Sequence, residues 1–242
     1  MHKHLAGQRA LITGASSGIG QATALALAAA GVHVALVSRR QDPLMAVAAE
    51  AQQLGVEAKA YPLDLAQVEQ IAPHLQSLAQ DFGGIDILIN NAGIGYTANL
   101  LDTPLQDWQQ VINLNLTSVF ACTQALLPEL RRNRRGAIVN VVSIGGRQAF
   151  PGWGAYCASK FGVMGFSKAL AAEERTHGIR VIALCPGSVN TPLWDTETVH
   201  ADFERSAMLT PEVVARSILD TLSLPPEAVI EELVLMPAGG AF

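Results

Sequence analysis

Hydrophobic and polar positions follow two recurring patterns along this chain. Short apolar runs bounded by turn residues predict strands over residues 9–13, 32–37, 56–63, 85–90, 137–143, 180–185 and 233–236. Longer segments with apolar residues at helical spacing predict helices over 19–30, 43–55, 104–132, 155–174 and 211–222, with another that ends near residue 81. This alternation is typical of an α/β fold with a single doubly wound parallel sheet of the Rossmann type and helices on both faces. We expect one domain over residues 1–242, with ligands at the carboxyl ends of the strands.

A glycine-rich turn joins the first predicted strand to the first helix. Gly14, Gly18 and Gly20 are spaced G-x-x-x-G-x-G in TGASSGIG. Gly14 can take the positive φ of a tight turn, Gly18 lets backbone approach a diphosphate, and Gly20 lets the helix pack near the sheet. The hydroxyl groups of Ser16 and Ser17 and the positive end of the helix dipole would favour an anion there. The spacing differs from the dinucleotide fingerprint G-x-G-x-x-G, so on this motif alone a turn that serves only packing stays open.

Composition narrows the class of protein. Half of the residues are hydrophobic, 15% are charged and the net charge is −5, which excludes disorder and argues against nucleic acid as the main partner. The three cysteines are Cys122, Cys157 and Cys185, and their wide, odd spacing suggests core residues in a reducing compartment, with neither a disulfide framework nor a metal site. The chain begins without a signal peptide, and no apolar stretch reaches about 18 uninterrupted residues. We therefore expect a soluble, cytoplasmic protein with no membrane partner.

Candidate chemistry lies where predicted strands and helices meet. Tyr156 and Lys160 are four residues apart in YCASK, on one face of a predicted helix, where an ammonium would lower the pKa of a phenol toward the range of acid and base catalysis. Ser143 ends the preceding strand and can donate to a carbonyl oxygen. Asn115 is oddly polar for a helix with a buried face and could hold a water that passes protons toward Lys160. Each residue also has a plainer interpretation as a surface pair, a cap or a local hydrogen bond.

Six motifs occur in the order of one known family. They are TGASSGIG at 13–20, NNAG at 90–93, Asn115 in NLNLTSVF, Ser143, YCASK at 156–160 and PGSVNTP at 186–192, and Tyr156 follows Ser143 by thirteen residues. The chain resembles the short-chain dehydrogenase/reductase family in its form of about 250 residues. The resemblance implies NAD(P)-dependent interconversion of a carbonyl and an alcohol, with Tyr156 as the acid and base.

The resemblance also implies roles for further residues. Ser143 would polarise the carbonyl, Lys160 would hold the nicotinamide ribose and Asn115 would hold a relay water, while Asn90 would brace the sheet and contact the adenosine ribose side. Asp64 would accept from adenine or simply cap the next helix, and Thr191 would bind the carboxamide. Besides the glycine turn, Tyr156 and Lys160, the implied cofactor positions are Ile19, Ser38, Arg39, Arg40, Asp64, Leu65, Asn91, Ala92, Gly93, Pro186, Gly187, Val189 and Thr191.

The end of the second predicted strand bears on the choice of cofactor. An NAD-binding strand usually ends in an acidic residue that accepts from the ribose 2′-hydroxyl, but here Ser38 is followed by Arg39 and Arg40. Because arginine matches phosphate geometry, we expect NADP(H). The alternative is that one arginine stacks on adenine, the other is solvated, and NAD is still accepted.

The substrate side and the assembly follow from less specific signals. Phe150, Trp153, Leu193 and Trp194 would line an apolar pocket for a neutral carbonyl compound, unless they are core or interface residues. Residues 188–210 are a candidate lid. The family implies a homodimer or homotetramer through the helices over 104–132 and 155–174. There are two alternatives to a carbonyl reductase. One is a 3-oxoacyl carrier-protein reductase, in which the arginines at 131–135 could meet an acidic carrier. The other is a non-catalytic dinucleotide sensor.

Overall fold

Seven parallel strands form one sheet in the computed structural model, which describes residues 4–201 and 204–240. Their order across the sheet is β3-β2-β1-β4-β5-β6-β7. The strands are β1 (Arg9–Thr13), β2 (His33–Ser38), β3 (Ala58–Pro62), β4 (Ile87–Asn90), β5 (Ala137–Val141), β6 (Arg180–Pro186) and β7 (Glu232–Leu235). The order reverses between β1 and β4, and in open α/β sheets the loops at that point diverge and leave a crevice for a ligand.

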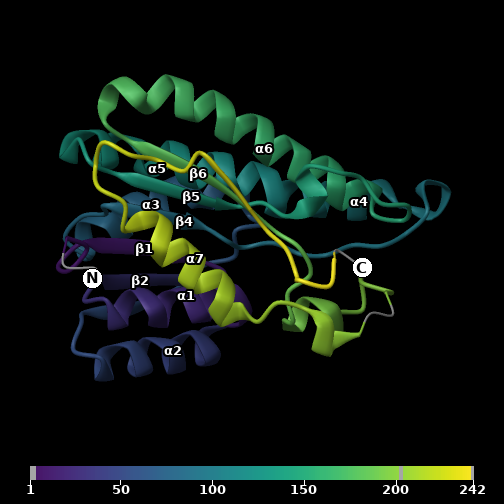
Figure 1. The fold of residues 1–242 in the computed structure, drawn as a ribbon, viewed down its shortest axis with the longest axis horizontal. Helices are drawn as coiled ribbons and strands as arrows, with labels where there is room; N and C mark the ends of the chain where they lie inside the picture. The colour runs from purple at the N-terminus through teal and green to yellow at the C-terminus, as the bar shows by residue number, and fades with distance from the viewer. Residues whose placement is uncertain (1–3, 202–203, 241–242) are drawn as a thin grey trace.

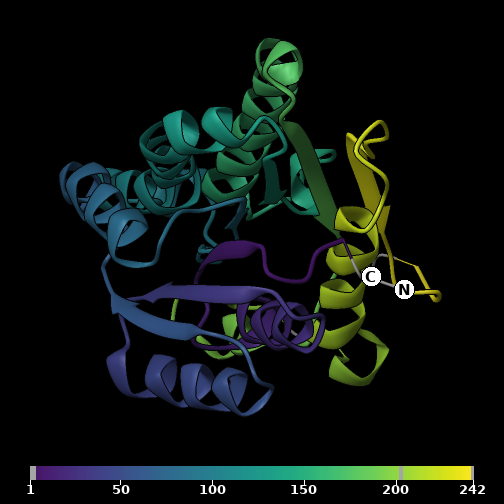
Figure 2. The same cartoon turned by 90° about the vertical axis from the view of Figure 1, so that its left-hand side faces the viewer.

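Helices cover both faces of the sheet, as predicted (Figures 1 and 2). One face packs against α1 (Gly18–Ala29), α2 (Gln41–Gln53) and α7 (Pro211–Leu222), whose buried residues join one apolar cluster with the strands. The other face packs against α3 (Val68–Asp81), α5 (Ser118–Asn133) and α6 (Gly154–Glu174). The doubly wound Rossmann-type fold is therefore confirmed.

The first three residues of the central strand β4 are apolar because both of its faces are covered. Ile87 and Ile89 pack into the cluster on the α1 side and Leu88 into the cluster on the α3 side, and each is at most 1% exposed. Successive side chains of a strand point to opposite faces, so a strand covered on both sides favours apolar residues at successive positions. Each such side chain contributes about 1.5–3 kcal/mol by burial.

The helix predicted over 104–132 is interrupted, which the sequence pattern did not indicate. The structure has α4 (Leu105–Ile112), a π-helical turn over Asn113–Thr117, and then α5. The wider turn carries Asn115 inward, where its side chain binds the backbone of Ile94. Single π turns are common where a helix serves a functional site.

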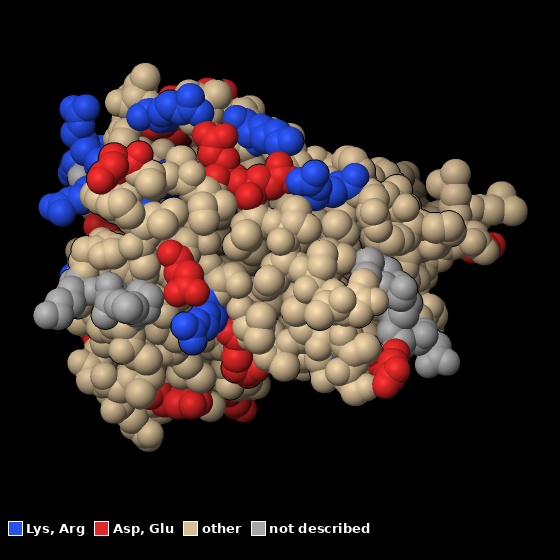
Figure 3. Space-filling view, in the orientation of Figure 1, with Lys and Arg blue, Asp and Glu red and all other residues tan. Residues whose placement is uncertain are grey.

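The helical stretch Leu105–Arg132 is also long and apolar enough to cross a membrane by length and composition alone. In this structure 44% of its most apolar window is buried, and Cys122, Leu126 and Leu130 pack between the sheet and α3. This contact with the sheet accounts for the apolar residues on its buried face. On the face drawn in Figure 3, basic and acidic side chains lie near one another along the upper edge and over the left half, and the right half is mostly uncharged.

Candidate active site

A cavity of about 660 Å³ lies at the carboxyl ends of the central strands. It is lined from the glycine turn after β1 to the loop after β6. The predicted residues that line it are Gly14, Ser16, Ser17, Gly18, Ile19, Ser38, Arg39, Arg40, Asp64, Leu65, Asn91, Ala92, Gly93, Ser143, Phe150, Trp153, Tyr156, Lys160, Pro186, Gly187, Val189, Thr191, Leu193 and Trp194. The elongated cavity thus brings together the predicted cofactor, catalytic and substrate positions.

Each of the three glycines in the first turn is needed for a different structural reason. Gly14 has φ +65°, and a Cβ there would lie 2.9 Å from the Cα of Ala92. Gly18 has φ +55° and faces the side chain of Thr191 across the cavity rim. A Cβ on Gly20 would lie 2.3 Å from the carbonyl oxygen of Gly14. Gly20 therefore lets α1 pack against the turn. It lies outside the cavity lining, and its contact with a cofactor stays a prediction.

Hydroxyl and guanidinium groups converge where β2 ends. The Arg40 Nη2 donates to Ser17 Oγ at 2.9 Å and to Ser16 Oγ at 3.2 Å. Ser16 and Ser38 share a hydrogen bond of 2.8 Å between their hydroxyl oxygens. Arg39 and Arg40 are both exposed at the cavity edge. Donors and positive charge therefore stand at the strand end where NAD-binding proteins usually have a carboxylate.

The two asparagines of NNAG face different surroundings. Asn91 lines the cavity, and its Nδ2 donates to the backbone oxygen of Thr13 at 3.0 Å. Asn90 is 3% exposed and lies away from the cavity, where its Nδ2 donates to Asn140 Oδ1 at 2.9 Å and Thr123 Oγ1 at 3.2 Å. The expectation that Asn90 braces the sheet is met, whereas the contact we expected with an adenosine ribose was wrong, since strand alternation turns its side chain toward α5.

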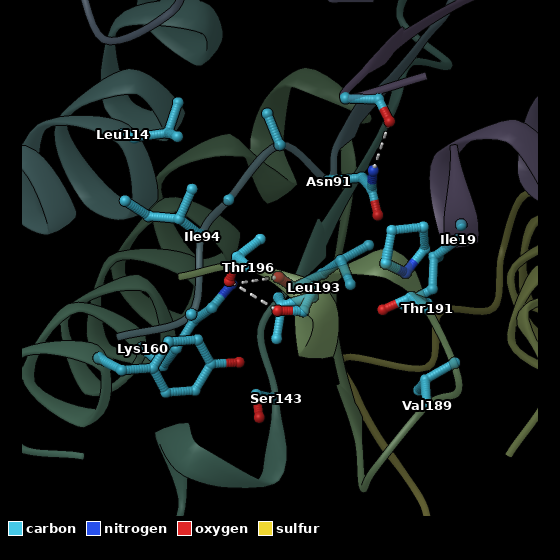
Figure 4. A pocket seen from close by; sticks show the side chains of 18 of the residues that line it. Ile19, Asn91, Ile94, Leu114, Ser143, Lys160, Val189, Thr191, Leu193 and Thr196 are labelled. Atoms are coloured by element: carbon cyan, nitrogen blue, oxygen red, sulfur yellow. Dashed lines mark hydrogen bonds between the residues drawn. The ribbon is translucent and has the colours of Figure 1, made fainter. Parts of the chain in front are cut away.

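Ser143, Tyr156 and Lys160 gather on one wall of the cavity. The Lys160 Nζ donates to the backbone oxygen of Val141 at 3.0 Å and lies 5.7 Å from the centre of the Tyr156 ring. The Ser143 Oγ accepts from the backbone N–H of Gly145 at 3.0 Å. Figure 4 shows Ser143 and Lys160 on this wall, with Ile19, Val189 and Thr191 opposite them. The three candidate catalytic side chains therefore line one cavity together.

Burial controls the protonation of the tyrosine and lysine. Burial raises the pKa of Tyr156 to about 12, although a hydrogen bond with Ser143 acts in the opposite direction. Burial also lowers the pKa of Lys160 to about 8. The expectation that the ammonium brings the phenol pKa down was wrong, because the loss of solvation on burial dominates the shift. Tyr156 is therefore a protonated phenol at neutral pH.

Asn115 lies behind the cavity wall and is fully buried. Its Oδ1 accepts from the Ile94 N–H at 2.8 Å, and its Nδ2 donates to the Ile94 oxygen at 2.9 Å and to Ser159 Oγ at 3.2 Å. Ser159 Oγ in turn donates to the backbone oxygen of Tyr156 at 2.6 Å. Both amide hydrogens are used in this way, so the side chain positions the 94 loop and α6. A Cβ on Gly93 would approach Asn115 Oδ1 to 3.2 Å, which explains the glycine there.

A family model described as short chain dehydrogenase matches residues 8–201. The chain belongs to the short-chain dehydrogenase family. A 3-oxoacyl-[acyl-carrier-protein] reductase of Synechocystis sp. is 41% identical over 199 residues, which cover 82% of this chain and 80% of the relative. A 3-oxoacyl-[acyl-carrier-protein] reductase of Thermotoga maritima is 38% identical and covers 89% of this chain and 90% of its own length.

Solved structures of other short-chain dehydrogenases share the whole fold. An alcohol dehydrogenase from Thermococcus sibiricus, complexed with 5-hydroxy-NADP, is 30% identical with a TM-score of 0.88 over 96% of this chain and 97% of its own. A metagenomic short-chain oxidoreductase in complex with NADP is 31% identical, with a TM-score of 0.85 over 97% of this chain and 98% of its own.

Two features of this short-chain dehydrogenase were missed from the sequence. Ser159, within YCASK, links Asn115 to α6, and its place next to Lys160 was a usable signal. Gly95 lines the cavity, and a Cβ there would lie 2.6 Å from Val199 Cγ2 and 2.9 Å from Leu193 Cδ2. The sequence gave no signal for Gly95, because its partners lie about a hundred residues further along the chain.

Proposed function

We propose that this protein is an NADP(H)-dependent oxidoreductase that interconverts a carbonyl and an alcohol on small, mainly apolar or neutral substrates. The observation that carries the proposal is that Ser143, Tyr156 and Lys160 line the same cavity as the glycine turn after β1. A phenol next to a hydroxyl and an amine, in reach of a dinucleotide site, has the groups needed to protonate a carbonyl oxygen.

The residues present fit a dinucleotide with a 2′-phosphate. Gly14 and Gly18 keep Cβ atoms out of the turn, and the N-terminus of α1 offers backbone N–H groups to a pyrophosphate. Arg40 and the hydroxyls of Ser16, Ser17 and Ser38 would hold the 2′-phosphate, with Arg39 beside them. The two similar structures solved with NADP or its 5-hydroxy analogue support this choice over NAD.

Other cavity residues would place the two ends of the cofactor. Asp64 Oδ1 accepts from the Ala66 N–H at 3.0 Å, so the carboxylate serves a local turn and keeps its other oxygen for adenine. Thr191 and Val189 would contact the carboxamide from the wall opposite Lys160. When bound, the reduced cofactor supplies a hydride to the carbonyl carbon.

The chain's own groups carry the proton side of the reaction. Tyr156 donates its phenolic proton to the carbonyl oxygen, and Ser143 donates a hydrogen bond to that oxygen and fixes its position. Lys160 stabilises the phenolate that is left and would bind the nicotinamide ribose. Asn115 holds the backbone of Ile94 and α6 in register, and a water beside it would return the proton toward Lys160.

The experiment that tests the proposal is Tyr156→Phe. NADPH oxidation with a panel of aldehydes, ketones, diketones and 3-oxoacyl thioesters should fall at least a hundredfold in the variant, since general acid catalysis contributes about 10²–10⁴-fold. NADPH binding, followed by quenching of tryptophan fluorescence, should persist. Turnover that is equal in wild type and variant would exclude Tyr156 as the acid, whereas turnover absent from both with NADPH still bound would favour a non-catalytic dinucleotide sensor.

A 3-oxoacyl carrier-protein reductase is the second candidate, favoured by the names of the relatives from Synechocystis and Thermotoga. In the basic cluster, Arg131 is paired with the buried Glu174 at 2.5 Å and Arg132 with Glu129. That leaves Arg134 and Arg135 to meet an acidic carrier. A KM for carrier-bound substrate that rises in the Arg134→Ala variant, with no change for a free ketone, would support this candidate.

Assembly and location complete the proposal. Phe120 on α5 and Phe161 on α6 are 46% and 45% exposed, so each presents apolar surface on a helix that the family resemblance assigns to assembly. A homodimer or homotetramer that joins these helices would cover them, and light scattering at the mass of a single chain would exclude it. We place the enzyme in the cytoplasm, in keeping with three buried free cysteines.

A further inference from the structure

Three aromatic rings form a continuous wall that begins at the candidate catalytic phenol. The ring of Trp153 lies 5.3 Å from that of Tyr156, with 71° between their planes, and 5.9 Å from that of Trp194, with 69° between them. Both contacts have the edge-to-face geometry that aromatic quadrupoles favour. All three residues line the cavity, with Phe150 next to them in the lining.

Hydrogen bonds hold the indole of Trp194 and the backbone at Trp153 in place. The indole Nε1 of Trp194 donates to the backbone oxygen of Val189 at 2.8 Å. Trp153 forms a parallel bridge with Ala98, where the Ala98 N–H donates to the Gly152 oxygen at 2.8 Å. A wall whose rings are held before a ligand arrives loses little side-chain entropy on binding.

Residues 193–199, which belong to the candidate lid, bound the same end of the cavity. The Thr198 hydroxyl donates to the Gly95 oxygen at 2.8 Å, and the Thr97 N–H donates to the Thr198 oxygen at 2.8 Å. Leu193 packs onto Gly95, where a side chain would leave no room for it. The pocket beside Tyr156 is therefore bounded by aromatic faces on one side and aliphatic groups on the other.

Charge is confined to the other parts of the cavity. Among the described lining residues, the charged ones are Arg39, Arg40 and Asp64 at the end of β2 and β3, and Lys160 behind the phenol. Two arginines in the flanking loops are already neutralised, Arg147 by Glu232 and Arg205 by Asp195. An anionic substrate would find no counter-charge at the aromatic wall, so the wall is suited to a neutral ring.

We propose that Trp153 and Trp194 are specificity-determining residues that select carbonyl compounds with an aryl group near the carbonyl. The inference rests on the proposed function and uses its reaction unchanged. The carbonyl carbon gains a hydrogen and two electrons from NADPH, which leaves as NADP⁺, and the oxygen gains the proton of Tyr156, which solvent replaces. The aryl ring packs against the two indoles while the carbonyl oxygen reaches the phenol.

A matched substrate pair tests the selection. Phenylacetone and cyclohexylacetone present the same unconjugated ketone and differ in whether the ring is aromatic. We expect wild-type kcat/KM to favour the aryl compound by about three- to tenfold, the range that aromatic contacts add beyond area. In Trp194→Leu and Trp153→Leu this ratio should fall toward one while the Kd for NADPH stays unchanged. A retained Kd also shows that a variant is folded.

Trp108→Leu is the matched control, since Trp108 packs in a separate cluster with Tyr96 and Val111. It should leave the ratio at the wild-type value. The inference is overturned if the wild-type ratio is near one, or if neither cavity variant changes the ratio. It is also overturned if a 3-oxoacyl thioester has a higher kcat/KM than the aryl ketone. Those outcomes leave the proposed oxidoreductase standing. That function fails separately, when no carbonyl compound is reduced.

Discussion

The positive charge of Lys160, which the proposed reaction uses, lowers the stability of the folded protein. The residue is 6% exposed, and burial lowers its pKa from the ordinary value of 10.5 to about 8. Because each pKa unit corresponds to about 1.36 kcal/mol, keeping this amine charged at neutral pH costs about 3 kcal/mol of folding free energy. Methionine has a similar length and no charge. The Lys160→Met variant loses the hydrogen bond to Val141, which is worth about 1.5–3 kcal/mol for a charged donor, so we expect a net gain of up to about 1.5 kcal/mol.

The pH dependence of this gain in stability shows whether the charge of Lys160 causes it. The pKa of Lys160 is lower in the folded than in the unfolded protein, so between pH 8 and 10.5 the unfolded chain holds more protons. Wild-type stability from this group therefore rises with pH across that window, and the penalty is fully present below pH 8. Urea unfolding of the NADPH-free protein, followed by circular dichroism at pH 7 and pH 10, should show the advantage of Lys160→Met at pH 7 and its decline at pH 10.

Lys168→Met supplies the control on the same helix. The Lys168 side chain is 66% exposed and makes one ion pair of 3.6 Å with Glu232, so its removal should change stability by less than about 0.5 kcal/mol. Reductase activity should be lost in Lys160→Met and kept in Lys168→Met. A Lys160→Met protein that is less stable than wild type at pH 7, or whose advantage is the same at both pH values, would refute the reasoning.

Three further predictions follow from the site. Arg40→Ala should lower kcat/KM for NADPH by about 10- to 100-fold and leave NADH unchanged, because a charge-assisted contact is lost, and an equal loss with both cofactors would contradict the 2′-phosphate role. Gly20→Ala should destabilise the fold by about 1–3 kcal/mol in thermal unfolding, since its Cβ would lie 2.3 Å from Gly14 O, and an unchanged Tm would exclude that clash. Carbonyl reduction should decline as pH rises through about 8, where Lys160 loses its proton while Tyr156 keeps its own, and a flat profile to pH 10 would remove Lys160 from the proton path.

The sequence predicted what depends on local spacing. Strand β4 could be found because burial on both faces leaves a continuous apolar run, and Tyr156 and Lys160 because one helical turn fixes their separation. Contacts between segments far apart in the sequence could not be predicted. The hydrogen bond from Thr198 to Gly95 joins residues 103 apart, and the sequence around Gly95 does not indicate it. The direction of the Tyr156 pKa shift was missed for a related reason, since burial is a property of the whole fold.

The wide turn at Asn113–Thr117 holds one residue more than ordinary helical winding needs. A deletion of one residue from it would restore an α-helix of nearly the same phase, so Cys122, Leu126 and Leu130 would keep their places against the sheet. The cost would fall on Asn115, whose side chain would lose its two hydrogen bonds to the backbone of Ile94. The core therefore accepts the shorter helix, whereas the site requires the extra residue.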